Sequence, residues 1–326
     1  MTAPSTIRPT GRLTDEERAA VDRLVAGAAA SDRVPPLSEQ SRLAVYGRSG
    51  HQPEHLLAYA TGALVGYAQV DEGSAELVVA PDHRRQGVGT ALLAALPAGI
   101  RVWAHGDQPA AGAFAAARGL DVVRELFVLG RRFADNPPLP DLVLPPGLVA
   151  RGFRPGRDEQ EWLRVNALAF AHHAEQGRLT LADLEARMAE PWFDAAGLIL
   201  VVPVDDARTV AAFHWTKIPP GGDGGAGVGG AHGSEGDEVE RGTGGAPNSR
   251  GAGVGEVYVV GVDPAYQGRG LGRPLTLLGL HHMRDQGVPD VILYVDGDNP
   301  AALAVYRGLG FTTRSVDRMY AAPPLT

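Results

Sequence analysis

The chain has no cysteine, and only one of its 30 lysine and arginine residues, Lys217, is a lysine. The absence of cysteine excludes disulfides, zinc–thiolate sites, iron–sulfur clusters and cysteine nucleophiles. Scarce lysine is typical of a GC-rich genome in which arginine codons have replaced lysine codons. A lysine that remains is therefore a candidate for a functional role, with an ordinary surface position as the alternative.

Long apolar runs are also missing. No stretch approaches the roughly 18 to 20 residues that span a bilayer, and residues 1–10 lack the basic-then-apolar order of a signal peptide. We therefore expect a cytoplasmic protein without membrane contact. The formal net charge of −8 disfavours non-specific nucleic-acid binding, which needs a basic face.

The length of 326 residues suits two domains of about 150 residues each. Residues 136–147 contain five prolines and read as a semi-rigid linker, which divides the chain into domains 1–135 and 148–326. Residues 219–255 are dominated by glycine and cannot bury enough apolar surface to order themselves. We expect a disordered loop inserted in the second domain, because strand-like residues flank it on both sides.

An internal repeat relates the two halves. Residues 76–93 match residues 259–276 without a gap, and residues 108–120 match residues 299–311 in the same way. The first alignment pairs Pro81 with Pro264, Gly87 with Gly270, and Gly89 with Gly272. Each half has a strand, a glycine-rich turn, an apolar helix, a short strand, a small-residue helix and a last strand. Duplication of one α/β unit explains this order most simply.

The glycine-rich turn at residues 267–272 reads Q-x-x-G-x-G between an expected strand, 258–262, and an expected helix, 271–283. Such a turn presents free backbone N–H groups at a helix N-terminus, where they and the helix dipole favour a phosphate. A Walker A loop would need G-K-[ST], and a dinucleotide fingerprint would need a glycine where Arg273 stands. The pattern favours a different phosphate-binding turn, present in both halves.

Both turns resemble the central motif [QR]-x-x-G-x-[GA] of the GNAT acetyltransferases, matched by residues 84–89 and 267–272. The resemblance implies an α/β fold of two tandem GNAT domains, each with a splayed mixed sheet flanked by helices. It also implies acetyl-CoA as co-substrate, with its pantetheine arm added like a strand and its pyrophosphate on the turn. It assigns cofactor contacts to Leu77, Val78, Val79, Arg85, Gln86, Gly87, Val88, Gly89 and Thr90, and to Val260, Gly261, Val262, Gln267, Gly268, Arg269, Gly270, Leu271, Gly272, Arg273, Asn299, Pro300, Ala301, Ala302, Leu303 and Ala304.

Two residues of the second half match the proton-handling positions of this family. The acceptor amine must lose a proton before it attacks the thioester, and the departing thiolate needs one. The resemblance makes Glu256 the base and Tyr306 the acid, with a solvated glutamate and a core tyrosine as the alternatives. The corresponding residues of the first half are Gly73 and Ala115, with Glu72 one position away. We expect that half to bind acetyl-CoA without catalysing.

The acceptor is suggested by a narrower resemblance to tandem members of the family, carried by residues 170–180, 213–217, 255–264 and 293–299. Those members acetylate the cysteinyl amine of a cysteine–glucosamine–inositol pseudodisaccharide. The resemblance implies substrate contacts from Glu39, Glu175, Lys217, Glu256 and Tyr294, although Glu39 could also simply open a surface helix.

The sequence also bears on metal binding and on oligomeric state. Two adjacent histidine pairs, at residues 172–173 and 281–282, lack metal spacing, so we expect no metal. We expect small-molecule partners and a monomer. Two alternatives stay open: a tandem acetyltransferase for another amine, such as an aminoglycoside or a protein N-terminus, and a non-catalytic acyl-CoA sensor.

Overall fold

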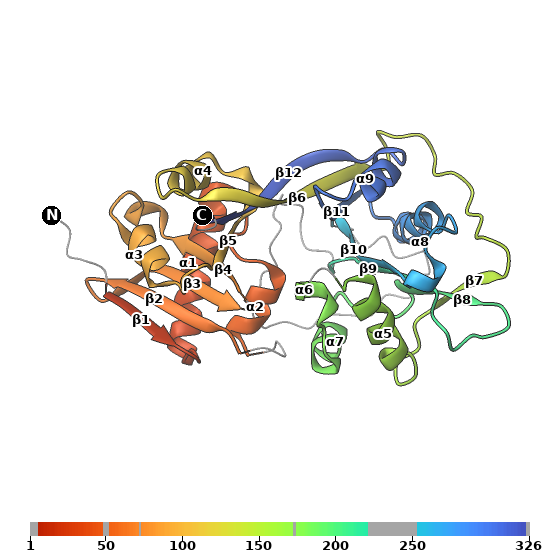
Figure 1. Cartoon of the computed structure of the whole chain (residues 1–326), viewed down its shortest axis with the longest axis horizontal. Helices are drawn as coiled ribbons and strands as arrows, with labels where there is room; N and C mark the ends of the chain where they lie inside the picture. Colours follow the sequence, from red (N-terminus) through yellow and green to blue (C-terminus); the bar gives the residue numbers. More distant parts are fainter. Residues whose placement is uncertain (1–5, 48–51, 72, 172–173, 221–252, 324–326) are drawn as a thin grey trace, which may run out of the picture.

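A computed structural model describes residues 6–47, 52–71, 73–171, 174–220 and 253–323. These residues form one 12-stranded mixed sheet in the order β1-β2-β3-β4-β5-β12-β6-β11-β10-β9-β8-β7. Two helix-covered halves lie side by side and are bridged by β6 and β12 (Figure 1). Within the described ranges, every helix is too short or too polar to cross a membrane.

The N-terminal half begins with a strand, two helices and a meander, followed by the first copy of the repeat. Its elements are β1 (Thr6–Thr10), α1 (Asp15–Asp32), α2 (Glu39–Val45), β2 (Glu54–Ala60), β3 (Ala63–Asp71), β4 (Ser74–Val79), η1 (Pro81–His83), α3 (Val88–Ala95), β5 (Arg101–Ala104), η2 (His105–Asp107), α4 (Pro109–Ala116) and β6 (Asp121–Arg132).

The C-terminal half repeats this plan, and the element order predicted from the repeat is confirmed from β10 to β12. Its elements are β7 (Leu148–Gly152), α5 (Glu159–Ala169), α6 (Ala174–Gly177), α7 (Leu181–Met188), β8 (Leu198–Pro203), β9 (Ala212–Lys217), β10 (Gly255–Val262), η3 (Pro264–Tyr266), α8 (Gly272–Asp285), β11 (Asp290–Asp296), α9 (Pro300–Arg307) and β12 (Thr312–Ala321).

The last strand of each copy crosses to the other copy. Strand β12 pairs antiparallel with β5 of the N-terminal half, and β6 pairs antiparallel with β11 of the C-terminal half. The two crossing strands also pair with each other from Thr312 opposite Gly130 to Ala321 opposite Asp121. Residues 136–147 connect β6 to β7, but the sheet does not divide at that point. The domain boundary along the chain therefore stays a prediction.

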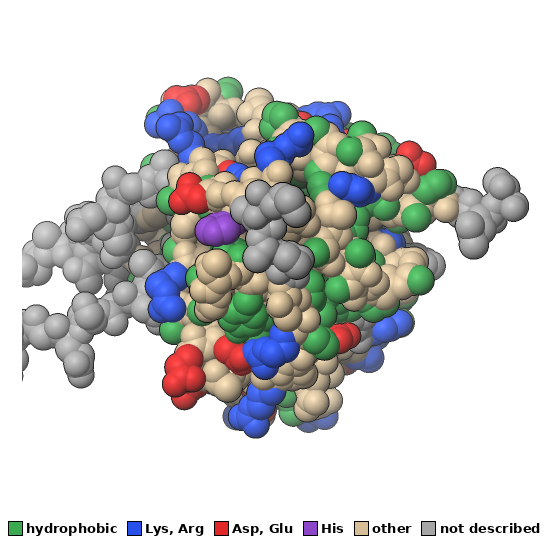
Figure 2. All heavy atoms as spheres, turned by 90° about the vertical axis from the view of Figure 1, so that its left-hand side faces the viewer, with side chains coloured by type: hydrophobic (Ala, Val, Ile, Leu, Met, Phe, Trp, Pro, Cys, Tyr) green, Lys and Arg blue, Asp and Glu red, His purple; other side chains and the backbone are tan. Residues whose placement is uncertain are grey.

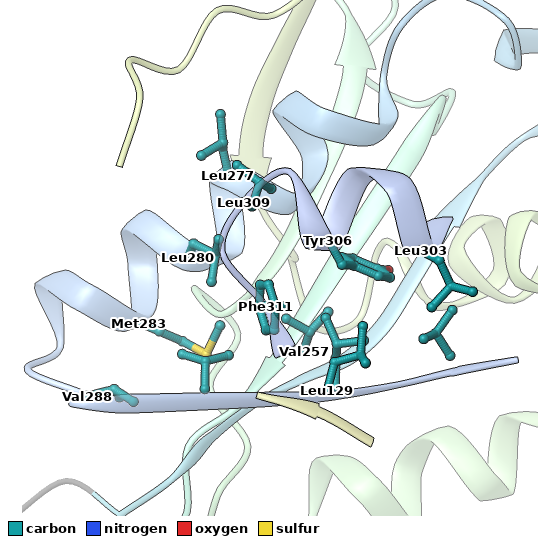
Figure 3. Packing of buried hydrophobic residues seen from close by; sticks show 13 residues of the cluster. Leu129, Val257, Leu277, Leu280, Met283, Val288, Leu303, Tyr306, Leu309 and Phe311 are labelled. Carbon is teal, nitrogen blue, oxygen red and sulfur yellow. The ribbon is translucent and has the colours of Figure 1, made fainter. Parts of the chain in front are cut away.

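The core of the C-terminal half shows the same exchange. Helices α8 and α9 pack their apolar faces on β10 and β11, with Leu280, Met283 and Phe311 buried between them (Figure 3). Leu129 of β6 belongs to this cluster although it precedes the linker. A second cluster, between α5, α7 and strands β8 to β10, contains Trp162, Trp192, Phe213 and Trp215. The core of the C-terminal half thus depends on burial contributed by a strand of the N-terminal half.

Local signals in the sequence explain several helix ends. Thr180 caps α7 in a reciprocal capping box with Asp183, as its spacing predicts. Asn299 caps α9, with Pro300 at the first helical position.

The predicted end of the glycine-rich insertion was wrong by one residue, because Gly255 is the first residue of β10. A Cβ there would lie 2.9 Å from Met283 of α8, so this glycine permits close packing of helix on strand.

The rest of the expected disordered loop, residues 221–252, lies outside the described residues. The strands on either side of it are paired with each other, and Lys217 at the end of β9 lies directly opposite Glu256 of β10. Two antiparallel strands in this register need only a short connection.

Deleting residues 221–251 is expected to leave turnover within about threefold, because a six-residue connection can join strands in this register. Steady-state kinetics and thermal unfolding of the shortened chain would check this. Loss of soluble protein, or of all activity, would mean that the segment takes part in the site.

Candidate acetyl-transfer site

Strand β10 separates from its parallel neighbour halfway along its length. It pairs with β11 only over its first three residues, from Gly255 to Val257. A register shift between Val257 and Val259 follows, and the strand continues beside β9 alone to Val262. Among the described residues, the backbone at 260–262 thus has no strand partner on its other side, where an extended ligand arm can pair.

The turn after β10 is shaped to bind an anion. Gly268 and Gly270 have φ of 76° and 75°, which glycine adopts without strain. Gln267 steadies the turn by donating from Nε2 to the carbonyl of Val262 at 3.5 Å. Helix α8 then starts at Gly272 without a side-chain cap, so no capping side chain occupies the backbone N–H groups of its first turn. This geometry fits the pyrophosphate that the motif predicts.

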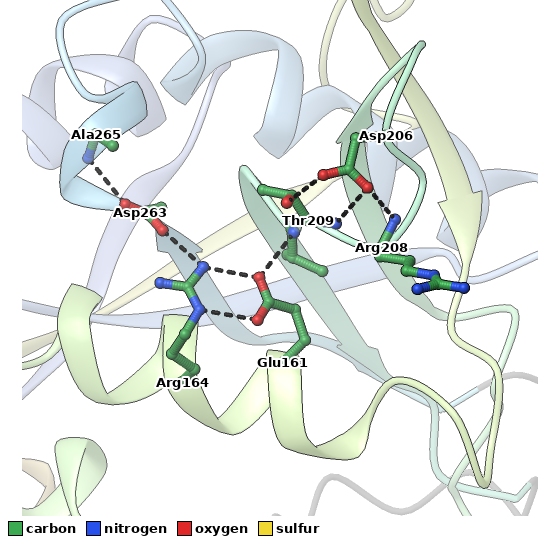
Figure 4. Close-up of polar contacts among 8 residues, drawn as sticks. Glu161, Arg164, Asp206, Arg208, Thr209, Asp263 and Ala265 are labelled. Atoms are coloured by element: carbon green, nitrogen blue, oxygen red, sulfur yellow. Dashed lines mark hydrogen bonds and ion pairs between the residues drawn. The ribbon is translucent and has the colours of Figure 1, made fainter.

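A buried carboxylate beside this turn is neutralised. Asp263 accepts hydrogen bonds from Arg164 at 2.9 Å and from the backbone N–H of Ala265 at 2.8 Å (Figure 4). Arg164 is held in turn by Glu161, and this hydrogen bond lowers the pKa of the Glu161 carboxyl. Without Arg164, the charge of Asp263 would repel a phosphate on the neighbouring turn. The sequence alone gave no reason to single out this network.

Lys217 joins carboxylates from both halves of the chain. Its Nζ forms an ion pair with Glu39 Oε1 and lies 4.0 Å from Glu256 Oε2. Its side chain is only 16% exposed, so the alternative of an ordinary surface lysine is wrong. Glu39 does open a helix, α2, capped by Ser38, and it also reaches the lysine. The structure therefore brings together three of the predicted substrate contacts.

The environment of Glu256 suits a general base. Burial raises its pKa to about 7, with Lys217 lowering the value and Glu39 raising it. A carboxyl with a pKa near the working pH is present in both protonation states and can exchange a proton with an amine. The alternative of a solvated glutamate at a strand start does not fit this burial.

Aromatic rings and an arginine complete the acceptor side. Lys217 Nζ lies 5.0 Å from the ring centroid of Trp192 and 5.2 Å from that of Tyr258. The Tyr258 hydroxyl accepts a hydrogen bond from Arg187 at 2.9 Å, and Arg187 also donates to Gln40 of α2 at 2.7 Å. Period-two alternation from Glu256 could have singled out Tyr258. No sequence signal links Trp192 or Arg187 to this strand.

Tyr294 and Tyr306, the two tyrosines predicted to act in the site, differ in how deeply they are buried. Tyr294 of β11 is 40% exposed. The pKa of its phenol is raised mainly by partial burial and, to a smaller extent, by the charge of Glu256. Tyr306 of α9 is 9% exposed and packs against Phe311 at 5.9 Å between ring centroids (Figure 3). Burial raises the pKa of Tyr306 to about 12, so its hydroxyl stays protonated at neutral pH. Its ring is part of the core, and the acid role of its hydroxyl stays a prediction.

The N-terminal half has the same turn without the proton-handling side chains. Gly87 has φ of 89°, and Arg85 keeps the left-handed conformation at 61° although it is not glycine. Strand β4 pairs with β5 only from Ser74 to Glu76, so this sheet is splayed as well. Gly73 lies in the tight turn before β4, and Ala115 is buried in α4. Both halves thus have a splayed sheet and a glycine-rich turn, and in the part of the chain that the structure describes only the second has a glutamate and a tyrosine at the positions of Glu256 and Tyr306.

Some predicted positions fall outside these observations. Glu72, His172, His173 and the side chain of Glu175 lie outside the described residues. His281 contacts the carbonyl of Pro140 at 3.0 Å, and no group of three or more metal-ligating side chains occurs in the described part of the chain. Asn299, Pro300 and the residues to Ala304 form the first turns of α9.

Comparisons with known proteins agree with this geometry. The acetyltransferase (GNAT) family model matches residues 172–311, and a second acetyltransferase (GNAT) domain model matches residues 51–119. A solved tandem GNAT protein from the clavulanic acid biosynthesis pathway covers 99% of this chain and 100% of its own, at 20% identity and a TM-score of 0.65. A GCN5-related N-acetyltransferase from Sphaerobacter thermophilus covers 98% and 97%, at 21% identity and 0.60. These likenesses show the fold: two tandem GNAT domains.

Curated relatives narrow the family. The mycothiol acetyltransferase of Thermomonospora curvata is 47% identical over 96% of each chain. That of Nocardia farcinica is 46% identical over 97% of this chain and 98% of its own. The chain is therefore a member of the GNAT acetyltransferases. Within them it belongs to the mycothiol acetyltransferase family.

Proposed function

We propose that this protein transfers the acetyl group of acetyl-CoA to the cysteinyl amine of desacetylmycothiol (cysteinyl-glucosaminyl-inositol), giving mycothiol and CoA. The observation that carries the proposal is a buried carboxyl, Glu256, placed where β10 leaves β11 and beside Lys217. The relatives named mycothiol acetyltransferase support the choice of acceptor.

The donor is held by backbone groups more than by side chains. The free edge at residues 260–262 pairs with the pantetheine arm, and the amides of the turn from Gln267 to Gly272 hold the pyrophosphate. Acetyl-CoA supplies an activated thioester, and this chain places it beside Glu256. The first half holds a second acetyl-CoA on its own turn around Gly87 and contributes no proton transfer.

Glu256 takes the proton of the attacking amine. A free α-amino group has a pKa of about 7.7 to 8.0, close enough to the pKa of Glu256, about 7, for transfer directly or through water. The amine then attacks the thioester carbon, and the carbon–sulfur bond breaks. Tyr306 donates a proton to the departing thiolate and is reprotonated, through water, by the second proton that the nitrogen releases as it becomes an amide.

The rest of the acceptor is bound around the lysine. Lys217, Glu39 and Tyr294 surround the approach to Glu256 and offer a cation, a carboxylate and a phenol to hydroxyl groups. Glu175 is a further proposed contact from α6. A polar sugar–inositol unit suits such a lining.

Substrate preference tests this proposal. At equal acetyl-CoA, cysteinyl-glucosaminyl-inositol is expected to exceed free cysteine in kcat/KM by about 10²-fold or more, since binding of the remote sugar assists the reacting centre. An aminoglycoside serves as the third acceptor. Preference for the aminoglycoside, or equal rates for all three, would reject the acceptor and leave the acetyltransferase chemistry standing. Absence of turnover with any amine would favour an acyl-CoA sensor.

A further inference from the structure

Three charged side chains are buried together in the half that lacks the base. His105, at the end of β5, lies between two carboxylates: its Nδ1 is 2.9 Å from Asp317 Oδ2, and its Nε2 is 3.3 Å from Glu76 Oε1. Glu76 and Asp317 are each 6% exposed. Buried charges are costly unless they are paired, so this cluster is a built feature of the fold.

The cluster is not arranged for proton transfer. Burial opposes the charge on His105, but the hydrogen bond to Asp317 and the ion pair with Glu76 raise its pKa to about 10. The same histidine lowers the pKa of the Glu76 carboxyl. At neutral pH the imidazole of His105 is therefore protonated, so it can hold elements together but is not free to act as a base.

What the cluster holds is the start of α2. The other oxygen of Glu76, Oε2, accepts a hydrogen bond from the backbone N–H of Ser38 at 2.8 Å. Ser38 is the N-cap of α2, and the next residue, Glu39, forms the ion pair with Lys217. The following residue, Gln40, accepts from Arg187 of the C-terminal half. One buried carboxylate thus fixes the end of α2 that reaches into the acceptor site.

The other side of the cluster is anchored in the exchanged strand. Asp317 belongs to β12, and its Oδ1 accepts from the backbone N–H of Gly106 at 2.7 Å. Strand β12 lies between β5 and β6 in the shared sheet. Glu76, His105 and Asp317 therefore form a chain of contacts from the shared sheet to the tip of α2.

We propose that Glu76, His105 and Asp317 are positioning residues, which hold α2 so that Glu39 meets Lys217 and thereby set the affinity for the acceptor amine. The half without a base thus contributes to acceptor recognition. This inference rests on the proposed site at Lys217 and Glu256, but not on the identity of the amine.

The test is a double-mutant cycle between Glu76→Gln and Glu39→Ala. A glutamine has one acceptor oxygen, so it cannot serve both Ser38 and His105, and it has no charge. Glu76→Gln is expected to raise the KM for the acceptor about tenfold while the KM for acetyl-CoA stays within about twofold. In the Glu39→Ala background the same change should add less than about twofold, because its effect passes through Glu39.

Asp158→Asn is the matched control. Asp158 is also a buried carboxylate, 7% exposed, paired with Arg151 at the start of α5. Its loss should lower thermal stability without changing the acceptor KM in either background. If Glu76→Gln does not fold, Asp317→Asn takes its place, with the same expected pattern.

Additive effects of Glu76→Gln and Glu39→Ala, or parallel rises in both KM values, would overturn the inference. The cycle uses the amine that the wild type acetylates best. Rejection of desacetylmycothiol by the wild type would thus refute the proposed acceptor, and it would leave the coupling between Glu76 and Glu39 to be decided by the cycle.

Discussion

Replacing Glu256 with glutamine is expected to lower kcat/KM by about 10²-fold or more, the usual scale for loss of a general base. The amide keeps the size of the side chain and its place on β10 but cannot take a proton. In the wild type, kcat/KM should rise with pH through about 7 as Glu256 ionises, and this inflection should disappear in the variant. Steady-state rates between pH 5.5 and 9 would show both effects.

Stability gives the control for this variant, because the burial that suits Glu256 to its proposed role as a base also works against folding. Its folded pKa of about 7 lies above the ordinary value of 4.5. The stabilisation from holding the proton is complete below about pH 4.5 and is lost as the pH rises through 7. At pH 8 the glutamine variant should therefore be more stable than the wild type, by on the order of 1 to 3 kcal/mol. An inactive variant that is also destabilised at pH 8 would contradict this account.

Replacing Gly270 with valine is expected to reduce turnover by about 10²-fold or more, whereas Gly87→Val should leave the chemical step within a few-fold, since only one turn faces a base. The two glycines are a matched pair, with φ of 75° and 89° and nothing within 4 Å of an added Cβ. Each substitution carries a similar backbone strain, of about 1 to 2 kcal/mol. A difference in kinetics therefore reports the use of the two turns.

Calorimetric titration with acetyl-CoA separates binding from chemistry in this pair. Each variant should lose one of two binding sites, and only Gly270→Val should lose turnover with it. Equal kinetic loss from both changes, with full binding retained, would show that both halves catalyse.

The glycine-rich turns could be predicted because their residues are contiguous. The turn from Gln267 to Gly272 needs only a strand, two glycines in left-handed conformations and a helix start, all within one short segment. The internal repeat then placed a second copy around Gly87. The family resemblance proposed Glu256 as the base, from its position at the start of the strand that leads into this turn.

The acceptor side required long-range contacts. Glu39 reaches Lys217 across 178 residues, and Arg187 meets Gln40 across 147. The resemblance supplied Glu39 and Lys217 as candidates. Their ion pair, and the places of Trp192 and Arg187 beside it, depend on how α2 and α7 pack against β9 and β10.

The sequence by itself determined the repeat, the two glycine-rich turns, the caps of α7 and α9 and the asymmetry between the halves, because each is set by residues within a few positions of one another. Only the tertiary structure decided that β6 and β12 exchange partners. Strand pairing depends on which edges meet in space, and the alternation of side chains along β6 and β12 is compatible with either neighbour. The tertiary structure also buries Glu76 and Asp317 around His105 and raises the pKa of Glu256, since burial and charge pairing exist only once distant segments have met.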